Sequence, residues 1–199
     1  ALRGALWTTA AAAAVAYGFS ALHRQLGSGQ DLPLILEASR ALRAGGSPYD
    51  VASGLHGYVY LPFLALVLTP LELLPRPAAI GIVYAGNLAL SALAFFWTAS
   101  LLTRSRFPGA TPTSARVAAA ISLAVHFRFF LANYDMGQVN LVILVLLLGA
   151  ARLATDSDRD TRAGFLIGLA AAIKPHALLV AVPFAFQRRW RASAEPRRG

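Results

Sequence analysis

The 199-residue sequence contains no cysteine, one methionine and few charged residues. Without cysteine the chain can form neither disulfides nor thiolate metal sites. Charged residues make up 14% of the chain and hydrophobic residues 57%, whereas a soluble domain has ~25% charged residues. Because too few polar side chains remain to cover a water-facing surface, we expect the solvent of this chain to be a lipid bilayer.

Acidic residues are also scarce, since 9 Asp and Glu stand against 18 Lys and Arg, for a formal net charge of +9. A basic chain can indicate a nucleic-acid partner. Here, however, arginines lie at the ends of apolar runs, as the positive-inside rule and contacts with head groups require; these are Arg76, Arg104, Arg106, Arg116, Arg188, Arg189 and Arg191. We therefore expect membrane lipids as partners and no nucleic acid.

The sequence also lacks a Gly-rich phosphate loop, a dinucleotide-binding fingerprint and His or Asp residues at metal-ligand spacing. The segment most similar to a metal-binding loop contains Asp156, Asp158 and Asp160. It has neither the glycine nor the terminal glutamate of a calcium loop. We predict no metal site and no cofactor.

About six apolar segments predict an all-α, polytopic transmembrane helical bundle that forms one domain over residues 1–199. They cover residues 4–22, 58–74, 78–102, 117–131, 141–154 and 163–186, and the shorter ones could be half-helices. The first is interpreted as a retained span, because no small-residue cleavage site there leads into a folded polar domain. The last is interrupted at Lys174-Pro175-His176, which breaks the helix or turns it back.

The topology follows from the same runs. A cytoplasmic N-terminus with single crossings places the loop 23–57 outside and the basic tail 187–199 inside. The arginines of the connection 103–116 then lie outside, against the positive-inside rule, unless one segment is re-entrant.

The loop 23–57 is predicted to contain one interfacial helix over residues 31–44. Its apolar and charged residues separate onto two sides, Ile35, Ala38 and Leu42 against Glu37, Arg40 and Arg43. Asp31 can cap this helix, Pro33 suits its first turn, and Gly45-Gly46 can end it.

Asp31 is the first candidate for chemistry, because it follows a membrane span at the mouth of a loop where a water-soluble group can meet a lipid-linked one. Its alternative role is the helix cap. The two roles are compatible, since a cap carboxylate at an interface has a fixed direction and is only partly dehydrated.

Lys174 is the second candidate, because a lysine within an apolar run is costly and usually faces a cavity, a counter-ion or a substrate path. It could bind a phosphate, with His176 as a hydrogen-bond donor beside it. Alternatively, Lys174 snorkels to one membrane face and Pro175 only kinks the helix.

The remaining candidates lie at expected membrane edges. Gln138 and Asn140 can hydrogen-bond sugar hydroxyls or phosphate oxygens, or can simply complete a tight turn before the next helix. Arg128 is a second phosphate-binding candidate or an interface anchor. Tyr60 is typical of an interfacial aromatic belt, and it is also a candidate for binding the donor.

Four segments in order along the chain resemble glycosyltransferase family 87 of the GT-C superfamily, the polyprenol-phosphate-mannose-dependent mannosyltransferases. They are Asp31 with EASRALRAGGSPYD (37–50), YVYLPF (58–63), GQVNLVILVLLLGAARL (137–153) and GFLIGLAAAIKPHALLVAVPFAFQRRW (164–190). The resemblance implies a GT-C fold whose first extracytoplasmic loop carries a catalytic aspartate, here Asp31. It also implies a polyprenyl-phosphate-linked donor, a mannosyl group as the sugar, and inversion of the anomeric centre.

The implied chemistry needs no metal. Asp31 accepts the proton of an acceptor hydroxyl, which attacks the anomeric carbon while the lipid phosphate leaves. Lys174 or Arg128 would stabilise the charge on that phosphate. The acceptor would be a lipid or a glycan, and the site would face outwards from a bacterial-type plasma membrane.

Two other functions stay open: a transporter or flippase fragment, and a non-catalytic scaffold subunit. A transporter concentrates polar groups at the midplane of several helices. In this sequence most polar groups lie at the ends of the apolar runs, which favours the enzyme.

Overall fold

The regular structure of this chain is helical apart from one small hairpin. The computed structural model describes residues 2–26, 30–53, 56–104, 111–154, 160–180 and 182. Within them are helices α1 (Leu2–Leu26), α2 (Asp31–Arg43), α3 (Pro62–Glu72), α4 (Arg76–Arg104), α5 (Pro112–Val125), α6 (Phe127–Met136), α7 (Asn140–Leu153) and α8 (Asp160–Ile173). Two 3₁₀ helices, η1 (Pro48–Asp50) and η3 (Pro175–Val180), and antiparallel strands β1 (Ala52–Ser53) and β2 (His56–Gly57) complete them. The all-α prediction is confirmed, while the hairpin in the first loop was not expected.

Several predicted features lie outside the described residues. They are the basic tail 187–199, residues 105–110 of the connection 103–116, and Asp156 and Asp158 of the acidic run.

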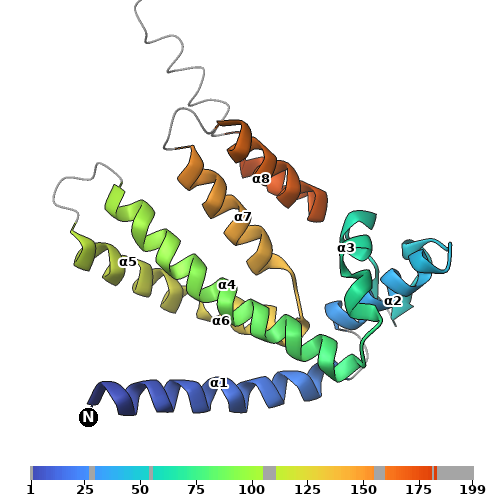
Figure 1. Ribbon diagram of the computed structural model, residues 1–199, viewed down its shortest axis with the longest axis horizontal. Helices are drawn as coiled ribbons and strands as arrows, with labels where there is room; N and C mark the ends of the chain where they lie inside the picture. The colour runs from blue at the N-terminus through green and yellow to red at the C-terminus, as the bar shows by residue number, and fades with distance from the viewer. Residues whose placement is uncertain are drawn as a thin grey trace, which may run out of the picture.

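α4 is the central helix of the arrangement (Figure 1). It packs against α1, α5 and α7, while α8 packs on α7 and α1 also contacts α6. The pair α2 and α3 packs together at one end of the molecule, near the start of α4. The end of α1 and the start of α2 therefore reach the same region as the turn between α6 and α7.

One described helix, α4, is long and apolar enough to cross a membrane by itself. α5 and α6 bend by 57° at their junction and make a second such segment if they form one span. α3, α7 and the apolar part of α8 are shorter. The predicted span 4–22 is helical within α1.

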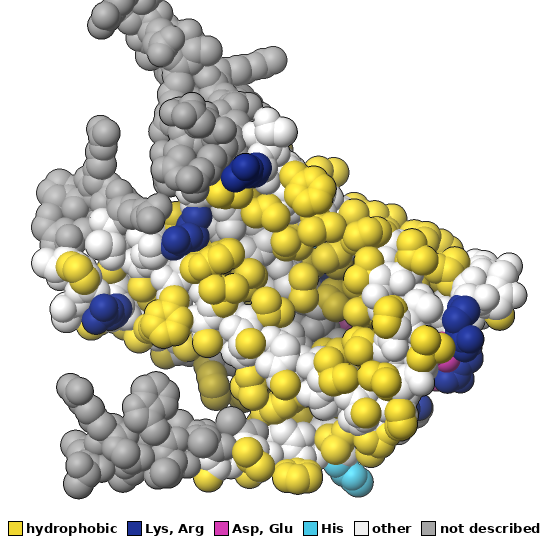
Figure 2. All heavy atoms as spheres, in the orientation of Figure 1, with side chains coloured by type: hydrophobic (Ala, Val, Ile, Leu, Met, Phe, Trp, Pro, Cys, Tyr) yellow, Lys and Arg dark blue, Asp and Glu magenta, His cyan; other side chains and the backbone are white. Residues whose placement is uncertain are grey.

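Large apolar side chains are exposed along most of these helices. Phe19 and Phe165 are each 70% exposed, and Phe129 is 71% exposed. Hydrophobic side chains cover much of the face in Figure 2, where Lys and Arg side chains lie toward its ends. Exposed apolar patches of this extent indicate a surface for lipid or for other protein segments.

α2 covers Asp31–Arg43 of the predicted helix 31–44, and local signals set its end. Gly45 has a positive φ of 81°, which glycine adopts without steric cost. The Gly46 N–H donates to the Ala41 carbonyl at 2.9 Å and the Gly45 N–H to the Leu42 carbonyl at 3.0 Å. This Schellman arrangement satisfies carbonyls that the helix leaves unpaired.

The predicted start of α2 is wrong in one detail. Gln30 occupies the cap position, and Asp31 is the first helical residue. An acidic residue in the first turn still interacts favourably with the helix dipole, but the side chain of Asp31 is available for another partner.

The two sides of α2 separate as predicted, yet both also contact protein. Ile35 and Ala38 are fully buried against α3 and the neighbouring helices. On the charged side, Arg40 Nε lies 2.7 Å and an Arg43 terminal nitrogen 3.0 Å from the carboxylate of Glu72, whose side chain is 3% exposed. Both arginines remain largely exposed, at 67% and 51% of the side chain, and they also fix α2 to the end of α3.

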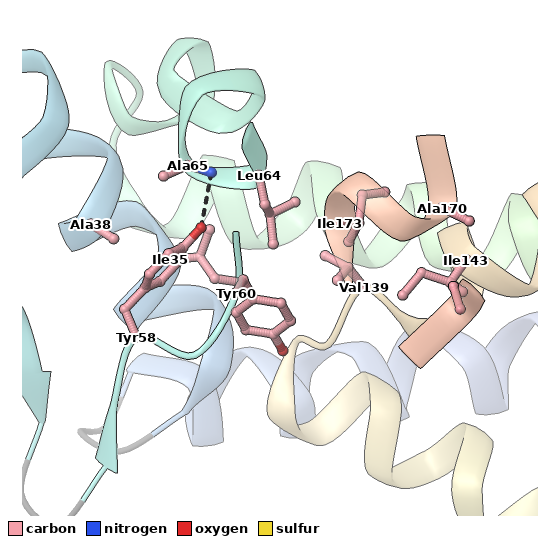
Figure 3. Packing of buried hydrophobic residues seen from close by; sticks show 11 residues of the cluster. Ile35, Ala38, Tyr58, Tyr60, Leu64, Ala65, Val139, Ile143, Ala170 and Ile173 are labelled. Atoms are coloured by element: carbon pink, nitrogen blue, oxygen red, sulfur yellow. Dashed lines mark hydrogen bonds between the residues drawn. The ribbon is translucent and has the colours of Figure 1, made fainter. Parts of the chain in front are cut away.

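Tyr58 and Tyr60 belong to the main apolar core rather than to an interfacial belt. They are 4% and 2% exposed and pack between α2 and α3 on one side and α7 and α8 on the other (Figure 3). The Tyr58 hydroxyl donates to the Leu61 carbonyl at 2.7 Å and accepts from the Ala65 N–H at 3.1 Å. The belt interpretation of Tyr60 is therefore wrong, because the core lies directly behind the start of α3.

Candidate functional site

Asp31 stands at the first position of α2, and its carboxylate is held by a buried tyrosine. The Tyr60 hydroxyl donates to Asp31 Oδ2 at 2.8 Å. Burial, followed by the Asp31 charge, raises the pKa of Tyr60 far above its ordinary value. Tyr60 therefore stays protonated and is a permanent hydrogen-bond donor. Among the described residues Asp31 Oδ1 has no such donor, so this oxygen is available to another group.

Lys174 lies where the last apolar run breaks. α8 ends at Ile173 and η3 begins at Pro175, so Lys174 is in the non-helical link between them. Proline has no N–H and clashes with the preceding turn, which explains the break. The predicted interruption of this run is confirmed.

The ammonium of Lys174 reaches the residues around Asp31. Its Nζ donates to Asn140 Oδ1 at 2.8 Å and lies 4.8 Å from the centre of the Tyr60 ring, within cation–π range. A carboxylate and an ammonium from distant parts of the sequence therefore share one site, with Tyr60 between them.

The turn between α6 and α7 supplies two amides to this site. Asn140 Nδ2 donates to Gln138 Oε1 at 2.5 Å, so Lys174, Asn140 and Gln138 form a chain of hydrogen bonds. The turn depends on Gly137, which has a φ of 64°. A Cβ at Gly137 would lie 2.5 Å from Leu32 Cβ, so the turn packs directly against the first turn of α2. The interpretation of this run as a tight turn is therefore confirmed, whereas binding of a sugar or a phosphate by its amides stays a prediction.

Two predicted site residues are not part of this cluster. His176 is exposed in η3 and Arg128 is exposed near the start of α6. Within the described ranges, no hydrogen bond or ion pair joins either of them to Asp31, Tyr60 or Lys174.

A second polar cluster joins α1 to α6 and was not predicted. The Tyr17 hydroxyl donates to Asp135 Oδ1 at 2.6 Å, and Arg24 forms an ion pair with the same carboxylate. Arg24 also lies over the Tyr17 ring. The sequence signal was the spacing of seven residues between Tyr17 and Arg24, which puts them on one helix face two turns apart.

A cavity of about 440 Å³ lies beside the site, between α4, α5, α6 and α7. Most of its wall is apolar, but Gln138, Asn140 and Asn133 also line it. Asn133 is 3% exposed, and neither Nδ2 nor Oδ1 of its side chain has a hydrogen-bond partner. The sequence pattern did not single out Asn133 as a site residue.

The arrangement suits acid–base chemistry on an anionic substrate. A fixed carboxylate can accept a proton, and an ammonium with neighbouring amides can bind phosphate and hydroxyl oxygens. Among the described residues no three His, Cys, Asp or Glu side chains are grouped to hold a metal ion.

Comparisons with known proteins agree with the resemblance of these segments. The profile described as Glycosyltransferase family 87 matches residues 58–195. Over 180 residues the chain is 28% identical to a polyprenol-phosphate-mannose-dependent alpha-(1-2)-phosphatidylinositol pentamannoside mannosyltransferase of Mycolicibacterium smegmatis (strain ATCC 700084 / mc(2)155). That alignment covers 82% of this chain and 39% of the relative, so the chain spans about two fifths of the relative's length. No solved structure matches the chain.

Proposed function

Because the chain belongs to glycosyltransferase family 87, we propose that it forms part of a membrane mannosyltransferase that takes mannose from a polyprenyl-phosphate-linked donor. The acceptor is a lipid or a glycan. The observation that carries the proposal is the convergence of Asp31, Tyr60, Asn140 and Lys174, because a base and a phosphate-binding cation are the two groups that such a transfer needs.

Asp31 acts as the general base. Its Oδ2 is occupied by the Tyr60 hydroxyl at 2.8 Å, which orients the carboxylate and leaves Oδ1 for the acceptor hydroxyl. Removal of that proton during attack on the anomeric carbon contributes about 10²- to 10⁴-fold to the rate in enzymes of this kind.

Lys174 stabilises the leaving phosphate. The lipid phosphate gains negative charge as the glycosidic bond breaks, so a nearby cation stabilises the transition state more than the ground state. Asn140 and Gln138 extend the polar surface from Lys174 and can hydrogen-bond the sugar or the phosphate. His176 and Arg128 are exposed, and we assign them to groups that approach from outside the cluster, such as lipid head groups.

The proposed setting is a polytopic GT-C bundle in the plasma membrane, with the loop 23–57 on the extracytoplasmic side. It is supported by the exposed apolar side chains of α1, α4, α5 and α6 and by the membrane-length apolar helices. Family membership favours this enzyme over the transporter and scaffold alternatives.

The test compares two carboxylates of one helix in the complete protein. Asp31→Asn should lower mannose transfer from the polyprenyl-phosphate donor by about 10²-fold or more. Glu37→Gln, on the exposed side of α2, should transfer mannose at the normal rate. Membrane insertion and protein level should be equal in both variants. Normal transfer by Asp31→Asn would remove this residue from the mechanism.

The orientation is tested separately. Glu37→Cys in a cysteine-free version of the protein should react with a membrane-impermeant thiol reagent in intact cells. Reaction only after cell lysis would place α2 on the cytoplasmic side and contradict the proposed topology.

A further inference from the structure

The cavity between α4, α5, α6 and α7 has the size and lining of a site for a lipid chain. Its volume of about 440 Å³ lies within the usual range for ligand pockets. Apolar side chains such as Phe95, Leu123 and Leu144 make up most of its wall. Phe129, which lines the cavity, is 71% exposed, so an occupant can enter from the surface beside this apolar side chain.

One part of this wall is polar, and it contains an amide without a partner. Asn133 lines the cavity and is 3% exposed, yet its Nδ2 and Oδ1 make no hydrogen bond. Buried side-chain amides are nearly always paired. A pure hydrocarbon would leave both atoms unpaired, so the expected occupant brings a hydrogen-bond acceptor and a donor to this point.

The polar part of the cavity is continuous with the site around Asp31. The Gln138 N–H donates to the Asn133 carbonyl at 2.9 Å, and both Gln138 and Asn140 line the cavity. Asn140 Oδ1 in turn accepts from Lys174 Nζ at 2.8 Å. The cation proposed to bind the leaving phosphate is therefore one hydrogen bond away from the cavity wall.

We propose that this cavity binds the phosphate-proximal part of the donor's isoprenoid chain, and that Asn133 binds the glycosyl phosphate at its mouth. Asn133 Nδ2 donates to a phosphate oxygen and Oδ1 accepts from a sugar hydroxyl, so one amide recognises both groups. This inference rests on the proposed function.

The donor fits this place better than the acceptor does. In an inverting transfer the acceptor hydroxyl and the leaving phosphate lie on opposite sides of the anomeric carbon. Asp31 defines the acceptor side, whereas Lys174 and Asn140 define the phosphate side. The cavity shares Asn140 with the phosphate side, so the chain attached to the phosphate is its occupant.

Two neighbouring alanines of α5 provide a matched kinetic test in the complete enzyme. Ala119 is 3% exposed and lines the cavity, whereas Ala118 is exposed. Ala119→Leu fills the cavity and should raise the donor KM about tenfold or more, with the acceptor KM unchanged. Ala118→Leu should change neither. An increase confined to the acceptor KM, or equal effects of the two substitutions, would overturn the proposal.

Asn133→Leu tests the polar end and keeps the number and branching of the heavy side-chain atoms. Loss of its hydrogen bonds to a charged group should raise the donor KM about 10- to 100-fold, while protein level and thermal stability in detergent stay normal. A normal donor KM in a folded Asn133→Leu enzyme would refute the role of this residue.

Photolabelling separates this inference from the proposed function, because it requires no sugar transfer. Polyprenyl phosphate with a diazirine near the phosphate should label peptides of α4–α7 in membranes, and Ala119→Leu should reduce the labelling. Normal labelling in a protein that transfers no mannose would refute the proposed mannosyltransferase function and would support the lipid-binding site. Labelling only elsewhere, or equal labelling by a diazirine phospholipid, would refute the lipid site even if transfer is normal.

Discussion

Tyr60→Phe isolates the hydrogen bond that orients the proposed base. The substitution removes one oxygen atom and keeps the ring that packs in the core and faces Lys174 at 4.8 Å. It therefore leaves the cation and the apolar contacts in place. What is lost is the donor to Asp31 Oδ2, which lies 2.8 Å from the hydroxyl.

The expected magnitude follows from the charge of the acceptor. A hydrogen bond to a charged group contributes about 1.5–3 kcal/mol, and about 1.4 kcal/mol corresponds to a tenfold change in rate. If the bond positions Asp31 for proton transfer, kcat should fall about 10- to 100-fold while the donor KM changes little. The measurement is steady-state mannose transfer by the complete enzyme in detergent or vesicles.

Tyr58→Phe is the matched control. Tyr58 is equally buried in the same core, but its hydroxyl bonds backbone atoms of Leu61 and Ala65 and not Asp31. We expect Tyr58→Phe to lower the free energy of unfolding by about 1–3 kcal/mol and to leave kcat unchanged in the folded protein. Unchanged kcat in Tyr60→Phe, or equal losses of kcat in both variants, would refute a positioning role for Tyr60.

Three further predictions concern the same region. Lys174→Met should raise the donor KM about tenfold or more, with partial recovery in Lys174→Arg; failure of arginine to recover any binding would argue against a charge effect. Gly137→Ala should lower the free energy of unfolding by at least about 1–2 kcal/mol, the cost of a left-handed alanine. As a control, Gly81→Ala in α4, where an added Cβ would meet no atom within 4 Å, should raise the free energy of unfolding by about 0.5–1 kcal/mol. Equal melting temperatures of the two variants would contradict the close contact of Gly137 with α2. Finally, burial raises the pKa of Tyr58 to about 12, and the pKa of Tyr60 is raised too, while an unfolded tyrosine ionises at about 10. The stability that these residues contribute is fully present below pH 10 and is lost as pH rises above it. The melting temperature should therefore fall above pH 10, and it should fall less steeply in Tyr60→Phe. If the substitution left the dependence of melting temperature on pH unchanged, the raised pKa of Tyr60 would be refuted.

Features that depend on local sequence were predicted well. α2 ends at the glycine pair because glycine accepts the positive φ that the Schellman turn requires. The break at Lys174 follows from Pro175, and the turn before Asn140 follows from Gly137. In each case the determining residue is within a few positions of the structure that it determines.

Features that depend on distant partners were not predictable from the pattern. Asp31 was expected to cap α2, but its hydrogen-bond donor is Tyr60, which is 29 residues away. Arg40 and Arg43 bind Glu72 for the same reason. The residues around Tyr60 suit an interfacial tyrosine and a buried one equally well. Tyr60 is buried because α7 and α8 pack against it, which the local sequence does not indicate.

The junction of α5 and α6 shows another limit. Residues 117–131 were expected to form one apolar segment, yet the chain bends by 57° between Val125 and Phe127. Neither proline nor glycine stands at this bend, which is occupied by His126. Arg128, which the pattern predicted as a phosphate partner, lies on the α6 side of the bend, and in the described part of the chain no hydrogen bond or ion pair joins it to Lys174.

The order in which the site residues occur along the chain has a consequence for biosynthesis. Asp31 and Tyr60 are close in sequence, so they can pair as soon as α2 and α3 have left the ribosome, which releases the N-terminal end first. Asn140 and Lys174 follow much later, and their arrival requires closure of long loops. The nascent protein therefore carries its oriented carboxylate before the ammonium opposite is made, and a chain interrupted before the end of α8 would have the proposed base without the Lys174 ammonium.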